Sequence, residues 1–220
     1  MGDHEGKAAL FDTLAEAAKA LSNGRRVELI DVLSQGERSV EVLAEEIDQS
    51  VANTSQHLQR LLRAGLVKTR RDGTRIMYML SSPAVFTLWR TMREATEAHV
   101  DELDAVARVY LGARDQLGTM TRDQLRKRLR EGDIVVLDVR PRAEYDAGHI
   151  RGAVSVPVAE LSTRLDEIPD GTDVVAYCRG PFCVYADDAV RVLETRGRSA
   201  VRLEDGFPEW AADKLPIERT

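Results

Sequence analysis

The spacing of apolar residues changes near the middle of the chain. Up to about residue 113, apolar side chains recur every three or four positions, which is the period of amphipathic helices. Beyond that point, short Val- and Ile-rich runs alternate with helical segments, a pattern typical of an α/β domain with a parallel sheet. We therefore expect two domains, a mainly α domain over residues 1–113 and an α/β domain over residues 114–220.

Four short helices are predicted in the first 65 residues. Lys7 to about Ala20 is Ala-rich and amphipathic, and Arg25 to Leu33 follows a break at Ser22-Asn23-Gly24. Ser39 and Ser50, both good capping residues, precede the third and fourth helices. The side chains that we expect to face inward are Leu10, Leu14, Ala17, Leu21, Val27, Ile30, Leu33, Val42, Leu43, Ile47, Thr54, Leu58 and Leu61.

The third and fourth helices are separated by a turn of three or four residues, the spacing of a helix-turn-helix. In that motif the second helix enters the DNA major groove by its N-terminal end, where short polar side chains suit base edges and phosphates. The alternative is a small helical bundle with a solvated hairpin. The DNA-contacting residues predicted on the fourth helix are Ser50, Ala52, Ser55, Gln56, His57, Gln59 and Arg60.

A basic hairpin follows this motif. Residues 66–80 alternate apolar and polar positions around Asp72-Gly73, a strong hairpin signal. Arg70, Arg71 and Arg75 lie at its tip and flanks, where the wing of a winged helix reaches phosphates or the minor groove.

Charge is unevenly distributed along the chain. The net charge of −6 argues weakly against nucleic acid, but residues 51–75 hold six basic side chains and a single acid. A basic patch inside an acidic chain is typical of a local DNA footprint. We expect double-stranded DNA as a partner.

The N-terminal half resembles the ArsR family of winged-helix repressors over about Leu10 to Arg93. The resembling segments are ALSNGRRVELIDVL, SVEVLAEEI and SVANTSQHLQRLLRAGLVKTRRDGTRIMYML. Many members of that family sense metals through cysteines in the first helix of the motif, and SVEVLAEEI has none. A second family site uses His and acidic residues on the C-terminal dimer helix, where this chain has Glu97, His99, Asp101, Glu102 and Asp104.

Tyr110 and Arg114 stand where the second histidine of that metal site is expected. We therefore predict no metal and no cofactor, and a metal-responsive repressor remains an alternative. The same region, Pro83 to about Ala113, is predicted to be one long helix that is too apolar for the small N-terminal domain to cover. We expect the same helix of a second subunit to cover it in a homodimer; the alternative is packing against the C-terminal half.

Strands and helices alternate through the C-terminal half. Thr121 is expected to cap a charged helix. The sheet would carry its site at the carboxyl ends of its strands, where Asp138 and Cys178 fall. The predicted strands are 134–139, 153–156, 174–177 and 200–203, and the predicted helices are 122–130, 143–148, 158–165 and 183–195.

Cys178 follows a buried strand and precedes a helix, with a turn forced by Gly180 and Pro181. The N–H groups at the start of that helix favour a thiolate, which a nucleophilic sulfur needs. The alternative is an inert core cysteine. The loop residues that we expect to hold an anionic sulfur are Gly180, Pro181, Phe182 and Val184.

The C-terminal half resembles rhodanese (sulfurtransferase) domains from about Thr121 onward. The segments that resemble this family are VVLDVRPRAEYDAGHIRGAVSVP, VVAYCRGPFCVYADDAVRVLE and LEDGFPEWAADKLPIE. The resemblance implies sulfane-sulfur transfer through a persulfide on Cys178, with supporting roles for Asp138 and Arg140. Arg179 could attract an anionic donor such as thiosulfate. Phosphatases of this fold need an arginine where Val184 stands, which makes phosphatase activity unlikely.

A second thiol lies five residues after the first. Cys183 could attack a persulfidated or oxidised Cys178 and form a disulfide or polysulfide bridge, which is the chemistry of a sensor. The alternative is that Cys183 is an idle, packed residue at the helix start.

The sequence thus predicts a dimeric DNA-binding transcriptional repressor whose rhodanese-like domain senses reactive sulfur or redox state. A sulfurtransferase that uses the winged helix for targeting or dimerisation is the main alternative, and its partners would be small sulfur species or a thiol acceptor. No apolar run approaches the length of a membrane span and the N-terminus lacks a secretory apolar core, so we expect a cytoplasmic protein without membrane contact.

Overall fold

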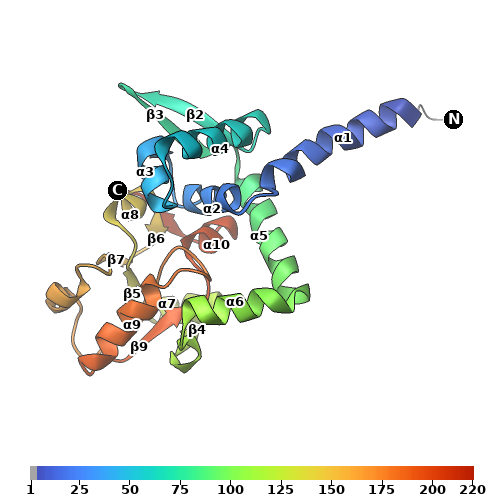
Figure 1. Ribbon diagram of the computed structural model, residues 1–220. Helices are drawn as coiled ribbons and strands as arrows, with labels where there is room; N and C mark the ends of the chain where they lie inside the picture. The colour runs from blue at the N-terminus through green and yellow to red at the C-terminus, as the bar shows by residue number, and fades with distance from the viewer. Residues whose placement is uncertain (1–3) are drawn as a thin grey trace. The chain divides into compact units, whose positions relative to one another are not determined.

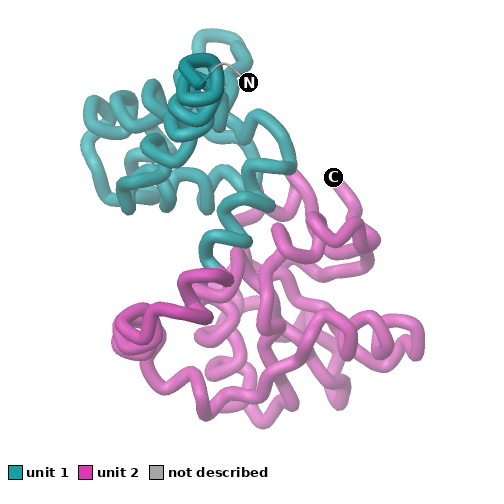
Figure 2. The backbone as a smooth tube through the Cα atoms, turned by 90° about the vertical axis from the view of Figure 1, so that its right-hand side faces the viewer, with its two compact units in different colours: residues 1–93 teal, residues 94–220 magenta. Residues whose placement is uncertain are grey.

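The computed structural model describes residues 4–220, which divide into two compact units. One unit extends to Arg93 and the other starts at Glu94 (Figure 2). The domain boundary predicted at residue 113 lies within the second unit. Each unit is described by itself.

The first unit is a helical domain with a small antiparallel sheet (Figure 1). Its core is formed by the inner faces of the second to fourth helices, with Leu29, Ile30, Leu43, Leu58 and Leu61 almost fully buried. The sheet has the order β1-β3-β2. The elements are α1 (His4–Leu21), α2 (Gly24–Leu33), β1 (Arg38–Ser39), α3 (Val40–Glu46), α4 (Val51–Arg63), β2 (Val67–Asp72), β3 (Arg75–Leu80) and the first part of α5 (Pro83–His99).

Two predicted caps have different outcomes. The Ser50 hydroxyl accepts a hydrogen bond from the backbone N–H of Asn53 and caps α4 as expected. Ser39 precedes α3 but makes no side-chain capping bond, and its backbone pairs with Met77 in the sheet.

Val42 was expected to face inward and is 43 % exposed, so that prediction is wrong. The buried stripe of α3 runs through its neighbours Leu43, Ala44 and Ile47, which leaves Val42 outside.

The helix α1 is almost uncovered within its unit. It projects away from the other helices of its unit in Figure 1, and Ala20 is its one buried residue. Leu10, Phe11 and Leu14 are each more than half exposed, so this part of the predicted inward face has no cover within the unit, whereas Leu21 packs against the core.

The wing is a regular hairpin. Its strands pair from Val67 opposite Leu80 to Asp72 opposite Arg75. The turn is therefore Gly73-Thr74, one residue beyond the pair indicated by the sequence. Gly73 has φ +59°, a conformation that favours glycine.

The long helix predicted from Pro83 to about Ala113 is broken into two. α5 ends at His99, Val100 is extended at φ −126° and ψ 92°, and α6 (Asp101–Leu111) begins anew. Three acids lie in the first turn of α6, where they stabilise a helix N-terminus through its dipole. A single continuous helix is therefore the wrong prediction for this region.

The second unit contains a five-stranded sheet in the order β4-β9-β8-β5-β7, in which each neighbouring pair of strands is parallel. The four predicted strands are present, and β4 adds an edge strand between the predicted domain boundary and the helix capped by Thr121. A separate antiparallel pair joins β6 to β10. The strands are β4 (Thr119–Met120), β5 (Ile134–Asp138), β6 (His149–Ile150), β7 (Val154–Ser155), β8 (Asp173–Tyr177), β9 (Ala200–Leu203) and β10 (Ile217–Glu218).

Helices cover both faces of this sheet. Alternate residues of β8 pack on opposite sides, with Val174 and Ala176 in the cluster that contains α9 and Val175 and Tyr177 in the cluster that contains α7 and α10. Thr121 caps α7 with a full capping box, as predicted. The helices are α7 (Arg122–Glu131), α8 (Arg142–Ala147), α9 (Tyr185–Thr195) and α10 (Phe207–Ala212), with 3-10 turns η1 (Arg114–Gln116), η2 (Leu161–Thr163) and η3 (Leu165–Glu167).

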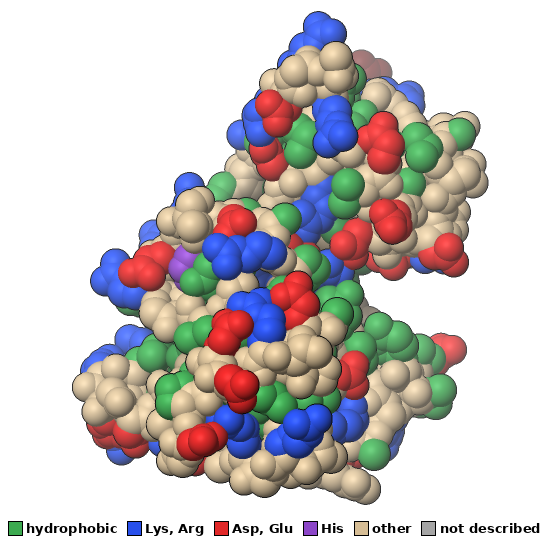
Figure 3. All heavy atoms as spheres, turned by 90° about the vertical axis from the view of Figure 1, so that its left-hand side faces the viewer, with side chains coloured by type: hydrophobic (Ala, Val, Ile, Leu, Met, Phe, Trp, Pro, Cys, Tyr) green, Lys and Arg blue, Asp and Glu red, His purple; other side chains and the backbone are tan. Residues whose placement is uncertain are grey.

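The helix predicted at 158–165 is wrong, because this segment forms the 3-10 turns η2 and η3. Ser162 and Thr163 have lower helix propensity than the residues around them, and the Thr163 N–H bonds the Glu160 carbonyl three residues back. No helix formed by residues 4–220 is long and apolar enough to cross a membrane. Basic and acidic side chains are interspersed on the face drawn in Figure 3.

Candidate functional site

The loop between β8 and α9 surrounds the first cysteine. Cys178 is the first residue after β8, and the alternation of that strand directs its side chain into the same cluster as α9. Cys178 is only 3 % exposed, whereas Cys183, in the loop before α9, is half-buried. Both are free thiols. The structure thus places both cysteines in one loop, and the side chain of Cys183 is the more accessible of the two.

The two thiols interact with each other. The Cys178 sulfur lies 3.7 Å from the Cys183 carbonyl oxygen and 3.9 Å from that of Gly180. Burial raises the pKa of Cys178 well above its ordinary value, and the neighbouring Cys183 adds to this rise. The neighbouring Cys178, with backbone donors of Arg179 and Tyr185, lowers the pKa of Cys183.

The thiolate expected at Cys178 is opposed by burial. The backbone groups of Gly180 and Ala186 do lower the pKa of Cys178 in the predicted direction, but burial outweighs them. The pKa of Cys183 is lowered instead, so Cys183 is the more acidic of the two thiols.

Arg179 is held by an acid that sequence analysis missed. Its Nη2 lies 2.6 Å and its Nε 2.9 Å from Oε1 of Glu144, which is fully buried in α8. The guanidinium also lies over the Tyr185 ring, 5.4 Å from its centre. This pairing fixes the side chain next to the loop and neutralises much of its attraction for an anionic donor.

Asp138 and Arg140 form a buried support beside β8. The Asp138 carboxylate accepts hydrogen bonds from the backbone N–H and the guanidinium of Arg140, and from the hydroxyl of Tyr177. Arg140 also donates to the Gly148 carbonyl at 2.8 Å and lies over the Phe207 ring. Both side chains are 0 % exposed, so they brace the strands and helices around the loop and are closed to solvent.

A second wall of the loop comes from the start of α10. The Phe207 N–H donates to the Cys178 carbonyl at 3.1 Å. Gly206 approaches so closely that a Cβ atom there would lie 2.3 Å from the Gly180 nitrogen and 2.4 Å from the Arg179 carbonyl carbon. Gly206 and Phe207 belong to the segment LEDGFPEW, which carried part of the rhodanese resemblance, but neither was singled out.

Arg114 lies against the loop on the side of α9. Its Nε pairs with Asp187 at 2.6 Å, and its terminal nitrogens donate to the carbonyl oxygens of Pro181 and Cys183. The sequence indicated no role for Arg114 at this site, because no spacing in the sequence connects it with a loop that lies 67–73 residues away. Phe182 and Val184, the other predicted loop residues, are partly exposed.

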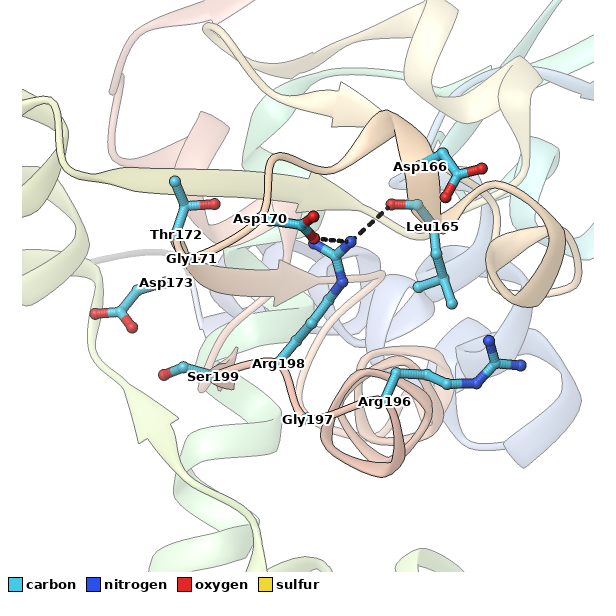
Figure 4. A pocket seen from close by; sticks show the side chains of 10 residues that line it. All are labelled: Leu165, Asp166, Asp170, Gly171, Thr172, Asp173, Arg196, Gly197, Arg198 and Ser199. Atoms are coloured by element: carbon cyan, nitrogen blue, oxygen red, sulfur yellow. Dashed lines mark hydrogen bonds and ion pairs between the residues drawn. The ribbon is translucent and has the colours of Figure 1, made fainter.

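A cavity of about 500 Å³ lies at the other end of β8 and does not include either cysteine (Figure 4). Arg198 crosses its wall, donating to the Leu165 carbonyl and pairing with Asp170 at 2.7 Å. These contacts join the end of α9 to the segment before β8, so Arg198 has a structural role. The candidate site is therefore the loop itself.

Most residues predicted to contact DNA lie on the open side of α4. Ser50, Ala52, Gln56, Gln59 and Arg60 are exposed. Ser55 and His57 are half-buried. Burial and three nearby arginines lower the pKa of His57, so its ring is neutral at pH 7.

The wing arginines differ in their partners. Arg70 makes a bidentate contact with Glu37, with its Nε 2.8 and 2.9 Å from the two carboxylate oxygens. Arg71 and Arg75 are exposed. Arg70 therefore ties the wing to the residue before β1, whereas Arg71 and Arg75 remain open to solvent.

The acids considered for a metal site are divided between two helices. Glu97 and His99 end α5, while Asp101, Glu102 and Asp104 begin α6. Over residues 4–220, no three His, Cys, Asp or Glu side chains are grouped so that they could hold a metal ion.

Comparison with known proteins divides the chain in the same way. A family model described as "Bacterial regulatory protein, arsR family" matches residues 23–69, and one described as "Rhodanese-like domain" matches residues 121–213. The HTH-type transcriptional regulator Rv0324 of Mycobacterium tuberculosis is 42 % identical over 217 residues, which cover 99 % of this chain and 95 % of that protein.

Two further similarities each cover one half. A protein described as "Sulfurtransferase" from Allochromatium vinosum is 35 % identical over 85 residues, covering 39 % of this chain and 78 % of its own. A solved fragment of Mb0332 from Mycobacterium bovis, described as a homodimeric winged helix-turn-helix DNA-binding domain, is 39 % identical. It covers 46 % of this chain and 93 % of that fragment, with a TM-score of 0.43.

Proposed function

Since the chain belongs to the family of ArsR-type transcriptional regulators that carry a C-terminal rhodanese-like domain, we propose that it is a homodimeric DNA-binding repressor that senses reactive sulfur through Cys178 and Cys183. The observation that carries this proposal is the presence of two free thiols in the β8–α9 loop, with the Cys178 sulfur 3.7 Å from the Cys183 carbonyl oxygen. A sulfur placed on Cys178 has an internal thiol acceptor next to it, which favours a switch over repeated turnover.

The chemistry begins at a polysulfide. With Cys183 as a thiolate, Cys178 gives its proton to it and attacks a sulfur–sulfur bond of the polysulfide. That bond breaks, a new sulfur–sulfur bond forms on Cys178, and the shorter hydropolysulfide leaves with the electron pair. Cys178 is then a persulfide.

The second step closes the bridge. Cys183 loses its proton to water, which its lowered pKa favours, and attacks the inner sulfur of the persulfide. A disulfide joins Cys178 to Cys183 and hydrosulfide leaves with the electron pair. The two thiols are oxidised and the sulfane sulfur is reduced to sulfide, so no other oxidant is needed.

The DNA-binding half acts as a dimer in this proposal. Leu10, Phe11 and Leu14 on α1 and Val109 and Tyr110 on α6 are apolar and more than half exposed within their own units. A second copy of the chain would remove these surfaces from water, and a two-fold dimer suits a palindromic operator. The α4 helix would enter the major groove and the wing would contact phosphates. A regulator of this kind must reach the chromosome, in keeping with the expected cytoplasmic location.

Mass spectrometry of the intact chain tests the sulfur chemistry. After polysulfide treatment and removal of excess reagent, the wild type should be about 2 Da lighter than the reduced chain, because a disulfide lacks two hydrogens. The Cys183→Ser variant should stop at the persulfide, about 32 Da heavier. A wild type that also stops at the heavier species would show that Cys183 does not resolve the persulfide.

Sulfurtransferase turnover is the second candidate. The 35 % identity with the Allochromatium vinosum protein, which is described as a sulfurtransferase, favours it. Thiocyanate formation from thiosulfate and cyanide measures it directly. Sustained turnover that is faster in Cys183→Ser than in wild type would show that Cys178 is the catalytic cysteine and that Cys183 slows turnover.

A further inference from the structure

We propose that Arg114 is a positioning residue that ties the cysteine loop to the end of α6, and that joining Cys178 to Cys183 releases it. This inference rests on the sensing role proposed above, and it names the residue through which the state of the loop reaches the dimerisation segment. Arg114 lies three residues after the end of α6 and is only 9 % exposed.

The guanidinium of Arg114 spans three positions around the loop. Its Nη2 donates to the Cys183 carbonyl oxygen at 2.5 Å, its Nη1 donates to the Pro181 carbonyl oxygen, and its Nε pairs with Asp187 of α9 at 2.6 Å. Arginine presents donors in a rigid planar fork, so the three acceptors must keep their spacing for all three contacts to persist. A movement of the loop therefore changes the contacts of Arg114.

One of these acceptors is shared with the reactive sulfur. The Cys183 carbonyl oxygen lies 3.7 Å from the Cys178 thiol and also accepts from Arg114. A disulfide requires a narrow range of Cβ separations and a dihedral angle near 90°, so bridging rotates Cys183 toward Cys178 and carries its carbonyl with it. The same step removes the thiol hydrogen, and one oxygen thus links the chemistry to Arg114.

A second arrangement is available to the groups that Arg114 would leave. Asp187 is 0 % exposed, and a buried carboxylate strongly resists losing its cation. Its Oδ1 has no hydrogen-bond partner, and 3.6 Å away lies the Nε of Arg202, which also has none. When Arg114 departs, Arg202, which already lies within ion-pair distance of Asp187, can move closer and keep its charge neutralised.

Release of Arg114 would loosen the segment that precedes it. None of the residues of α6 is buried, so this helix has few anchors of its own. The chain passes from α6 through Gly112, at φ +61°, to the buried Arg114. In the other direction α6 connects through Val100 to α5, which begins in the DNA-binding unit. A change at Arg114 therefore acts on the covalent connection between the two units.

Hydrogen–deuterium exchange of the full chain tests this coupling. It would be measured on the reduced protein, after polysulfide, and after diamide, a thiol oxidant that joins the cysteines without a sulfur donor. In the wild type, formation of the Cys178–Cys183 disulfide should speed exchange of residues 101–117 by about fivefold or more, because the contacts of Arg114 no longer hold this segment against the loop. Arg114→Gln should show the fast exchange already when reduced and no further response. Arg108→Gln is the matched control, because the Nε of Arg108 bonds the carbonyl of Asp104 on its own helix.

Two additional variants distinguish the loss of the Arg114 contacts from a general misfolding of the unit. Arg114→Lys keeps the charge opposite Asp187 but cannot make all three contacts of the guanidinium. Residues 101–117 should then exchange at a rate between those of the wild type and of Arg114→Gln, while peptides from β8 keep the wild-type rate. Arg202→Gln removes the replacement cation and should suppress the response to bridging. The inference is overturned if residues 101–117 exchange equally before and after a bridge verified by mass, or if Arg114→Gln responds like the wild type. A response to diamide without any reaction with polysulfide would support the coupling and remove the sulfur-sensing role.

Discussion

Replacing Gly206 with Ala is expected to push the Cys178 loop out of its present position. The added Cβ would lie 2.3 Å from the Gly180 nitrogen, 2.4 Å from the Arg179 carbonyl carbon and 2.6 Å from the Arg179 oxygen. Carbon atoms in ordinary contact are about 3.5–4.0 Å apart, so the two backbones must separate by about 1 Å. Because the obstructing atoms are backbone, no side-chain rotation can relieve the clash.

The magnitude follows from the contacts that this movement disturbs. Overpacking of this kind costs about 1–3 kcal/mol. The hydrogen bond from the Phe207 N–H to the Cys178 carbonyl, 3.1 Å long, would stretch or break and add about 1 kcal/mol. We expect a total loss of about 2–4 kcal/mol and a greater exposure of Cys178.

Thermal unfolding and cysteine labelling measure the two effects. In a Cys183→Ser background, Cys178 is the single remaining thiol, and Gly206→Ala should speed its alkylation by N-ethylmaleimide several-fold. The control is Gly118→Ala in the same unit, where the Cβ would meet the side-chain end of Val201 at 2.8 Å. If Gly206→Ala left both the unfolding temperature and the alkylation rate unchanged, the close approach of Gly206 would not hold the Cys178 loop in position.

Three further predictions concern pH, the buried acid and the wing. Folding raises the pKa of Cys178 above its ordinary 9.0, so the stabilisation from keeping this thiol neutral is present below pH 9 and is lost as pH rises. Thermal melts from pH 7 to 10.5 should show this loss in wild type and less of it in Cys178→Ser. Arg179→Gln removes a cation from the buried Glu144 and should destabilise the chain by about 3 kcal/mol in denaturant unfolding, and a loss below 1 kcal/mol would contradict the pairing. Arg71→Ala should weaken binding to any DNA sequence and reduce the slope of log affinity against log salt by about 1, whereas Arg70→Ala should change the slope less because Glu37 already neutralises Arg70.

The elements of the fold were largely predictable because their signals are local. Ser50 marks the start of α4 by its capping chemistry, and the apolar run at 174–177 marks β8 and places Cys178 at its end. The break at Val100 was missed because the apolar period continues across it. The acids that follow it gave a signal for a new helix N-terminus, but they were considered as metal ligands.

The surroundings of the cysteines were less predictable because they depend on contacts between distant residues. Glu144 pairs with Arg179 from 35 positions away, and Arg114 with Asp187 from 73. Nothing in the spacing of a sequence distinguishes such an arginine from an ordinary solvated one. The protonation of Cys178 has the same origin, since burial, a tertiary property, outweighs the helix-start amides that the sequence does indicate.

DNA affinity measured by fluorescence anisotropy at fixed salt, on the region upstream of the chain's own gene, tests the central claim most directly. Wild type and Cys178→Ser would each be measured reduced and after polysulfide, since salt alone changes protein–DNA affinity steeply. We expect polysulfide to change the affinity of the wild type and to leave that of Cys178→Ser unchanged. Equal affinity in all four states, with the wild-type bridge verified by mass, would contradict the proposal that the sulfur chemistry of this loop regulates DNA binding.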